Sequence, residues 1–304
     1  MKKFLVLIYL LAAVSAIAQN PVVSAGKIIH YENFNSVFVD ARNVDVWVPD
    51  GYGPDKRYAV IYMQDGQMLF DSTNTWNHQE WGVDETMTKL QKEKKIRNCI
   101  VVGIWNIPGK RYAEYFPQKI IDSIPEATRN KILTKQLKGT PLADNYLKFL
   151  IRELKPFIDS HYSTLKDAGN TYMMGSSMGG LLSLYAVCEY PKVFGGAACL
   201  SIHSPVACLE LMDQNTDADV AQKFRNYLVR NLPKANSVKI YFDYGSIGED
   251  GFYGPYQKAL DDIMTKQGYT SSSWISRYFS GEGHSEKSWK KRLDIPILFL
   301  LKKN

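Results

Sequence analysis

The sequence predicts an α/β fold, in which a mostly parallel sheet carries helices on both faces. Three observations lead to this prediction. From about residue 58 onward, short apolar runs alternate with longer helical patterns. Several of those runs are almost continuously apolar, which is typical of strands buried on both faces. No Pro/Gly/Ser-rich linker or charge block interrupts the alternation, so one domain is expected.

The first residues resemble a secretory signal. Lys2 and Lys3 precede an apolar run from Phe4 to Ala18, polar only at Ser15, that ends in small residues. The run is too short and wrongly flanked for a stable membrane span. We therefore expect a signal peptide at residues 1–18 and a single domain at 19–304, exported to the periplasm or secreted, with no stable membrane span after cleavage.

The chain has 304 residues and a net charge of +6, and cleavage after Ala18 would leave 286 residues and a charge of +4. Lysines and arginines are scattered among acids, so nucleic acid is not an expected partner. The cysteines lie mostly in apolar settings, which suggests buried thiols rather than a disulfide framework, although a pair such as Cys199 with Cys208 stays open. The histidines and cysteines lack zinc-site spacing. We expect no metal and no cofactor.

The elements follow in order along the chain. Antiparallel strands are expected at residues 27–30, 37–39 and 44–48, after which buried strands are expected at 58–63, 99–104, 171–174, 194–201, 238–244 and 274–279. Helices are expected at about 81–94, 142–160, 178–190, 219–231 and 256–267, and from 289 onward. Two segments, 106–145 and 202–218, exceed ordinary connection lengths and are predicted to be lid-like loops or substrate walls.

A candidate nucleophile follows the strand at 171–174. Residues 175–179 read Gly-Ser-Ser-Met-Gly and lead directly into a helix, so they form a G-x-S-x-G pattern in strand-turn-helix context with Ser177 at its centre. The glycines allow a sharp turn that lifts the serine above the sheet. Ser176 is the competing serine, but it is not the centre of the glycine frame.

A serine hydroxyl needs an adjacent base, and the expected chain order is serine, acid, histidine. His284 lies in a glycine-flexed loop between the last strand and the last helix, where the base should be. His203 lies just past a strand with no acid behind it in that order, and it is interpreted as a loop or wall residue. The turn after the strand at 238–244 supplies two candidate acids, Glu249 and Asp250, which the residues alone do not separate.

An ester-cleaving site also needs donors for the developing oxyanion. The backbone N–H of Met178, one residue past the nucleophile, is the first expected donor. The second is expected from the loop after an early central strand, at the backbone N–H of Gln67. Asp243 lies inside a strand and is interpreted as structural.

Taken together, the motifs resemble those of the "putative esterase" family of α/β hydrolases, which includes feruloyl, acetyl-xylan and enterochelin-type esterases. The matching pieces are residues 62–71, Arg111 with residues 114–117, residues 175–180, residues 243–245 with Asp250 and Tyr253, and residues 283–286 with Trp289. The resemblance implies an α/β-hydrolase fold with antiparallel N-terminal strands, and Ser177 and His284 as nucleophile and base. It supports Gln67 and Met178 as oxyanion donors and favours Asp250 over Glu249 as the acid.

Four residues are candidate substrate contacts: Asp65, Arg111, Tyr115 and Trp105. The rings of Trp105 and Tyr115 fall on or beside loops expected at the catalytic face, where they could stack on a sugar or an aryl acid; a place in the core is the alternative for each. Arg111 could meet an acidic group of a substrate or pair with Glu114.

The predicted function is that of a serine carboxylic-ester hydrolase acting through an acyl-enzyme, on a small-molecule or polysaccharide-linked ester. Export and aromatic loops favour removal of feruloyl or acetyl groups from plant polysaccharide. The alternatives are an enterochelin-type siderophore esterase and a non-catalytic glycan-binding protein on the same fold.

Overall fold

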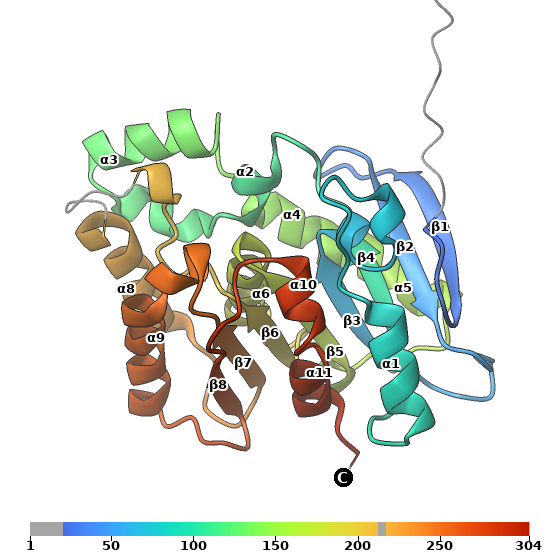
Figure 1. Cartoon of the computed structure of the whole chain (residues 1–304). Coiled ribbons are helices and arrows are strands. Elements are labelled where there is room, and N and C mark those ends of the chain that lie inside the picture. Colours follow the sequence, from blue (N-terminus) through green and yellow to red (C-terminus); the bar gives the residue numbers. More distant parts are fainter. Residues whose placement is uncertain (1–20, 212–216, 304) are drawn as a thin grey trace, which may run out of the picture.

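The computed structural model describes residues 21–211 and 217–303, so the expected signal peptide at 1–18 lies outside the described residues. Its centre is one eight-stranded sheet with the order β1-β2-β4-β3-β5-β6-β7-β8 (Figure 1). The strands are β1 (Lys27–Phe34), β2 (Arg42–Val48), β3 (Ala59–Gln64), β4 (Cys99–Ile104), β5 (Thr171–Ser176), β6 (Gly196–Leu200), β7 (Lys239–Tyr244) and β8 (Trp274–Tyr278).

Helices follow the strands as the alternation predicts. They are α1 (Val83–Lys92), α2 (Arg111–Tyr115), α3 (Glu126–Lys131), α4 (Ala143–Phe149), α5 (Lys155–His161), α6 (Met178–Glu189), α8 (Gln222–Asn231), α9 (Gly254–Lys266), α10 (Glu286–Lys290) and α11 (Asp294–Leu301). Strands β1 and β2 pair antiparallel with each other, and β2 pairs antiparallel with β4, whereas the pairs from β4 through β3 to β8 are parallel. The predicted sheet architecture is confirmed.

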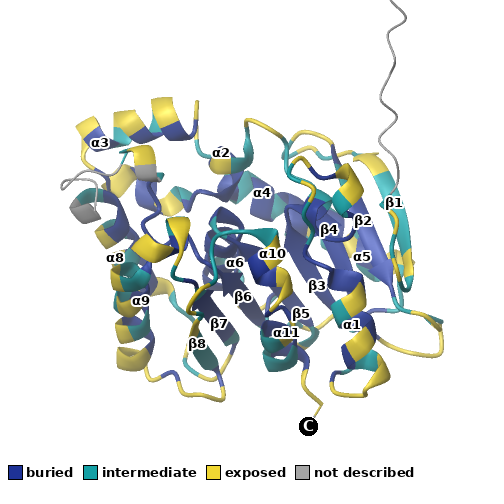
Figure 2. Cartoon of the chain, in the orientation of Figure 1, coloured by how far each residue is buried: buried dark blue, intermediate teal, exposed yellow. Residues whose placement is uncertain are grey.

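The sheet separates two apolar layers, and alternate residues of each central strand enter opposite layers. In β3, Val60 and Tyr62 belong to the layer that also contains buried residues of α4, α5, α6, α8 and α9, whereas Ala59, Ile61 and Met63 belong to the layer that contains residues of α1, α10 and α11. Both faces are therefore dry, which explains why the central strands read as continuous apolar runs. Figure 2 shows the buried strands at the centre, with the exposed residues on the outer helices and loops.

The strand expected at residues 37–39 is wrong. The Ser36 hydroxyl accepts hydrogen bonds from the backbone N–H groups of Phe38 and Val39, which curls the chain into a turn. Val37 is 87% exposed in that turn. Three β-branched and aromatic residues in a row suggested a strand, but the local side-chain hydrogen bonds stabilise a turn instead. Strand β1 instead extends to Phe34.

The long segments are more ordered than lid-like loops. Residues 106–145 contain α2, α3 and short helical turns, and several of their side chains, including Phe116, Ile120 and Leu137, are buried in the larger apolar layer. The described part of the segment at 202–218 begins with buried residues as far as Ala207. The described parts of these segments are thus partly helical or buried in this structure.

Candidate active site

The candidate residues gather where the parallel strands end. Ser177 follows β5, and His203 follows β6. Asp250 lies beyond β7 and His284 beyond β8. Because parallel strands present their carboxyl ends at one edge, four separate connections meet there, and this edge is where ligands bind in open α/β sheets.

Ser177 occupies a strained turn between β5 and α6. Its φ and ψ are 54° and −125°, a conformation that a side chain other than glycine rarely adopts. A Cβ at Gly175 would lie 2.7 Å from the backbone carbon of Gly179, so this strand can approach the helix only with glycine at position 175. The predicted sharp turn is present, and it places Ser177 at the N-terminus of α6.

His284 is oriented by Asp250. Its Nδ1 lies 2.7 Å from Oδ1 of Asp250, a fully buried carboxylate. The other oxygen, Oδ2, accepts hydrogen bonds from the Ser201 hydroxyl at 2.7 Å and the Gly245 N–H at 2.6 Å. These bonds fix the imidazole with Nε2 free to face the site. The geometry supports Asp250 as the triad acid.

Asp243 has the structural place expected of it. Arg292, itself buried, donates from Nε and Nη2 to the two Asp243 oxygens at 3.1 and 2.9 Å. Arg292 Nη2 also lies 3.0 Å from the Ser201 hydroxyl oxygen, which receives the indole N–H of Trp289 at 2.9 Å. Ser201 thus connects this ion pair to the carboxylate that holds His284.

Glu249 faces the other nitrogen of the histidine. Its Oε2 lies 3.9 Å from Nε2 of His284, and its Oε1 accepts the Tyr253 hydroxyl at 2.5 Å. Nδ1 of His203 lies 3.3 Å from the same Oε1. Burial raises the pKa of Glu249, but the contacts of His203, His284 and Tyr253 outweigh it and lower the pKa to about 2.

Tyr253 lies close to both Ser177 and His284. Ser177 is near enough to the Tyr253 hydroxyl to lower its pKa, and that hydroxyl lies 2.8 Å from Nδ1 of His203. Its ring packs edge-on against His284, with centroids 5.8 Å apart. Burial, followed by the charge of Glu249, raises the pKa of Tyr253 well above its ordinary value, so the phenol keeps its proton.

The loop that follows β3 carries the candidate oxyanion donor Gln67. The backbone of Asp65 adopts the left-handed conformation, with φ 57°, and Asp65 precedes a 3-10 turn at Gly66–Met68. A Cβ at Gly66 would lie 2.6 Å from the backbone carbon of Gly103 in β4, so the turn is pressed against the sheet. The Gln67 side chain accepts the backbone N–H of Asn106 at 3.2 Å, which holds this loop beside the next connection.

The structure shows the surroundings of three predicted substrate contacts, Asp65, Arg111 and Tyr115. Asp65 and Arg111 pair with each other through two hydrogen bonds of 2.8 Å, so the guanidinium charge is already neutralised. Arg111 does not form the suggested pair with Glu114, because Arg42 binds that carboxylate. Tyr115 is 0% exposed, so it belongs to the core and its expected contact with substrate is not available.

Trp105 lies half-buried past the end of β4. Its indole N–H donates to Asp45 at 2.5 Å, and its ring packs against His30. Tyr112, by contrast, is 40% exposed on α2. Burial raises the pKa of its hydroxyl, and the negative charges of Glu249 and Glu210 add to this rise. Of the two aromatic residues in α2, Tyr112 is therefore the one that a bound molecule could reach.

Ser201 and Tyr253 had no predicted role in the site, and His203 was expected only to be a loop or wall residue. Their signal in the sequence was only positional, since Ser201 and His203 directly follow β6 and Tyr253 lies three residues beyond Asp250. Residues that follow a parallel strand share the edge with Ser177, and that rule would have selected Ser201 and His203.

The four cysteines are all free, so Cys199 and Cys208 are not paired. Burial raises the pKa of Cys208 to about 11, and those of Cys99, Cys188 and Cys199 higher still. Within residues 21–211 and 217–303, three or more metal-ligating side chains do not gather anywhere. Over the same residues, the structure contains no helix with the length and apolarity of a membrane span.

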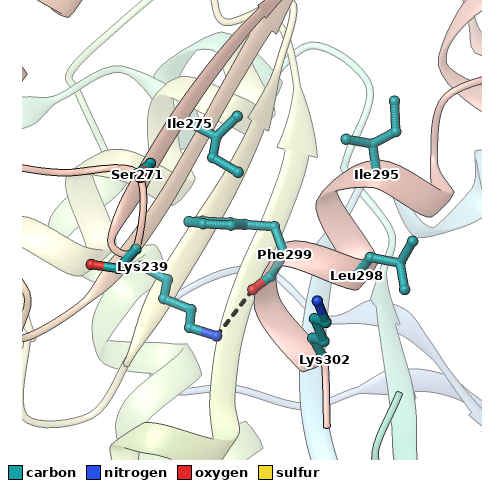
Figure 3. Close-up of a pocket in the computed structure, with 8 residues that line it drawn as sticks. Lys239, Ser271, Ile275, Ile295, Leu298, Phe299 and Lys302 are labelled. Carbon is teal, nitrogen blue, oxygen red and sulfur yellow. Dashed lines mark hydrogen bonds between the residues drawn. The ribbon is translucent and has the colours of Figure 1, made fainter. Parts of the chain in front are cut away.

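A recess of about 380 Å³ lies at the opposite edge of the sheet, between β8 and α11 (Figure 3). Lys239, at the start of β7, donates from Nζ to the Phe299 carbonyl at 3.0 Å and caps the end of α11. None of the candidate active-site residues lines this recess, so its volume does not identify the active site. Its lining residues are Lys239, Ser271, Ser272, Ile275, Ile295, Leu298, Phe299 and Lys302.

Curated proteins similar to this chain include an uncharacterised one and a named enzyme. Uncharacterized protein YbbA of Bacillus subtilis is 24% identical over 53% of this chain and 56% of its own length. Endo-1,4-beta-xylanase/feruloyl esterase of Xylanibacter ruminicola is 27% identical over 53% of this chain and 19% of its own length. The chain therefore matches only about half of the first relative and a fifth of the second.

Solved structures share the fold. An IroE-like serine hydrolase from Shewanella oneidensis aligns with a TM-score of 0.65 and 20% identity, over 90% of this chain and 80% of that one. A ferulic acid esterase from Anaeromyces mucronatus gives 0.57 and 18%, over 92% of each chain. The enterobactin esterase of Shigella flexneri gives 0.62 and 17%, over 92% of this chain and 60% of that one. These likenesses establish an α/β-hydrolase fold.

The family is shown by a match to its sequence model. The model described as "Putative esterase" matches residues 36–294, which include Ser177, Asp250 and His284. This chain belongs to that esterase family.

Proposed function

We propose that the protein is an exported serine carboxylic-ester hydrolase that acts through an acyl-enzyme. The observation that carries the proposal is the 2.7 Å contact between His284 Nδ1 and Asp250, at the edge where Ser177 occupies its strained turn. A serine at a helix N-terminus, a histidine held by a buried carboxylate and backbone donors nearby are the parts that acyl transfer requires.

Each group has one task in the proposed reaction. Ser177 Oγ attacks the ester carbonyl while His284 Nε2 takes its proton, and Asp250 stabilises the imidazolium that forms. The backbone N–H groups of Gln67 and Met178 receive the oxyanion. When the tetrahedral intermediate collapses, the ester bond breaks and His284 gives the proton to the leaving alcohol. Water then hydrolyses the acyl-enzyme, with His284 again as base.

We propose feruloyl or acetyl esters of plant polysaccharide as substrates. The printed names of the xylanase/feruloyl esterase relative and the ferulic acid esterase neighbour support this class. The charges at the site support an uncharged substrate over an anionic siderophore, because Arg111 is neutralised by Asp65 and Glu249 adds a carboxylate. A panel of methyl ferulate, acetylated xylan and enterobactin, compared by kcat/KM, tests the choice.

Removal of the nucleophile tests the reaction itself. Ser177→Ala should lower hydrolysis of p-nitrophenyl acetate by at least about 10³-fold, because no other hydroxyl occupies the turn in that orientation. Ser176→Ala is the matched control, since its side chain is buried in β5 and its variant should keep the activity and the labelling by a fluorophosphonate. Equal hydrolysis by the Ser177→Ala enzyme would refute the mechanism.

A further inference from the structure

Glu249 is a second carboxylate at the catalytic histidine, and the triad does not use it. Asp250 already holds Nδ1 of His284, whereas Glu249 approaches Nε2, the nitrogen that must face the serine and the leaving alcohol. Its side chain is 32% exposed, so a bound molecule can reach it. Two carboxylates adjacent in sequence therefore face opposite sides of one imidazole.

The carboxylate is fixed in place by side chains that are themselves buried. Tyr253 is 0% exposed and donates to Oε1, and His203 is 3% exposed and contacts the same oxygen. Nε2 of His203 lies 3.0 Å from the Ala207 carbonyl, which anchors the ring to the wall segment after β6. These contacts occupy Oε1 and leave Oε2 directed at the site, with little rotamer freedom left to lose on binding.

The position of Oε2 relates it to the alcohol half of an ester. The leaving oxygen must come within about 3 Å of His284 Nε2 to receive its proton. Oε2 of Glu249 lies 3.9 Å from the same nitrogen. It is then within hydrogen-bond reach of a hydroxyl in the alcohol half, on the carbon next to the one that bears the ester oxygen. An ionised carboxylate only accepts hydrogen bonds, so it recognises a hydroxyl and repels an anion.

We propose that Glu249 selects esters whose alcohol carries a free hydroxyl on the neighbouring carbon, as a sugar or glycerol does. This inference rests on the proposed esterase function and names the alcohol that the site takes. Tyr253 and His203 are positioning residues, because they hold the carboxylate and act on the substrate only through it.

Two matched esters test the inference: 2-hydroxyethyl acetate and 2-methoxyethyl acetate. They have the same length, and only the first can donate a hydrogen bond to Glu249. The wild-type enzyme should favour the hydroxyl ester by about tenfold or more in kcat/KM, the range for a charge-assisted hydrogen bond. Glu249→Gln should reduce the ratio to about threefold or less, mainly through the hydroxyl ester. Glu210→Gln is the matched control, because it removes a charge from an exposed residue in the segment after β6; it should keep the wild-type ratio.

Several outcomes would overturn the proposal. They are a wild-type ratio near one, hydrolysis of p-nitrophenyl acetate without measurable hydrolysis of either alkyl ester, and an equal loss on both esters in Glu249→Gln. The last would mean that the carboxylate acts on the charge of His284. Failure of the esterase function itself would be distinct, because the wild-type enzyme would then hydrolyse neither p-nitrophenyl acetate nor the matched esters.

Discussion

At the scale of single residues, the site depends on the direction of two neighbouring carboxylates. Asp250 and Glu249 share one turn after β7, yet Asp250 points into the protein, where Ser201 and Gly245 also bind it. Glu249 remains partly exposed and contacts Tyr253. The buried acid can orient His284 because two other hydrogen bonds, from Ser201 and Gly245, fix its position.

Asp250→Asn should therefore be the more damaging of the two amide substitutions. The amide keeps the shape of the side chain but presents the wrong group to Nδ1 of His284, and kcat on p-nitrophenyl acetate should fall by about 10³ to 10⁴-fold. Glu249→Gln should lose at least tenfold less. Steady-state rates, with circular dichroism to verify folding, measure both. A larger loss in Glu249→Gln would make Glu249 the triad acid.

The sequence predicts Ser177 and His284 as nucleophile and base because glycines and chain order constrain them, and the structure places both beyond the carboxyl ends of parallel strands. It did not separate Glu249 from Asp250, because residues adjacent in a turn differ in direction only once the turn is folded. The sequence indicated Asp65 and Arg111 as candidate contacts but did not predict that they pair with each other. The two residues lie 46 positions apart, in different connections. Long-range pairings of this kind have no local pattern.

At the scale of elements, the close approach of the turn at Gly66–Met68 to β4 positions the candidate oxyanion donor. The Gly66 Cα faces the backbone of Gly103 and Ile104, where an added Cβ would lie 2.6 and 2.7 Å from backbone atoms. Backbone cannot yield as a flexible side chain can, so the turn or the strand would have to move.

Gly66→Ala should lower both stability and activity. Overpacking of this kind typically costs about 1–3 kcal/mol in the free energy of unfolding, and the displaced Gln67 N–H should reduce kcat as well. Urea denaturation and p-nitrophenyl acetate hydrolysis measure the two effects. Gly53→Ala, where an added Cβ would meet nothing within 4 Å, is the control. If the Gly66 variant matched this control in both measurements, the oxyanion assignment for this turn would lose its support.

Most elements were predictable because burial on two faces leaves a clear pattern. Strands β3 to β7 and helix α6 lie close to their expected ranges. The errors lie where local hydrogen bonds or tertiary burial dominate. A turn at Ser36 stands where a strand was expected, and the segment at 106–145 contributes Phe116 and Leu137 to the core, although its length suggested a lid-like loop or substrate wall.

At the scale of the whole molecule, a buried ion pair unites the C-terminal segment with the sheet. Arg292 follows α10, and its partner Asp243 lies in β7 at 0% exposure. Burial raises the pKa of Asp243, an effect that the guanidinium charge and hydrogen bonds from Arg292, Ser201 and Tyr241 oppose. The pair also contacts Ser201 after β6, so three separate connections share it.

Arg292→Met should destabilise the entire fold, because it leaves the Asp243 carboxylate buried without its partner. A loss of about 3–5 kcal/mol in the free energy of unfolding is expected from urea denaturation. Arg277→Met, in an exposed position of β8, removes the same charge and should change stability by less than about 0.5 kcal/mol. Equal stability of the two variants would show that the buried pair contributes nothing net.

The chain order of these groups has a consequence for synthesis. Ser177 and Asp250 leave the ribosome before His284, and Arg292, which braces the acid loop through Ser201, follows last. A nascent or truncated chain that stops before residue 284 has the nucleophile but neither the base nor the brace. If His284 is the base and Arg292 braces the acid loop as proposed, a chain that lacks residues 284–292 should be inactive toward esters.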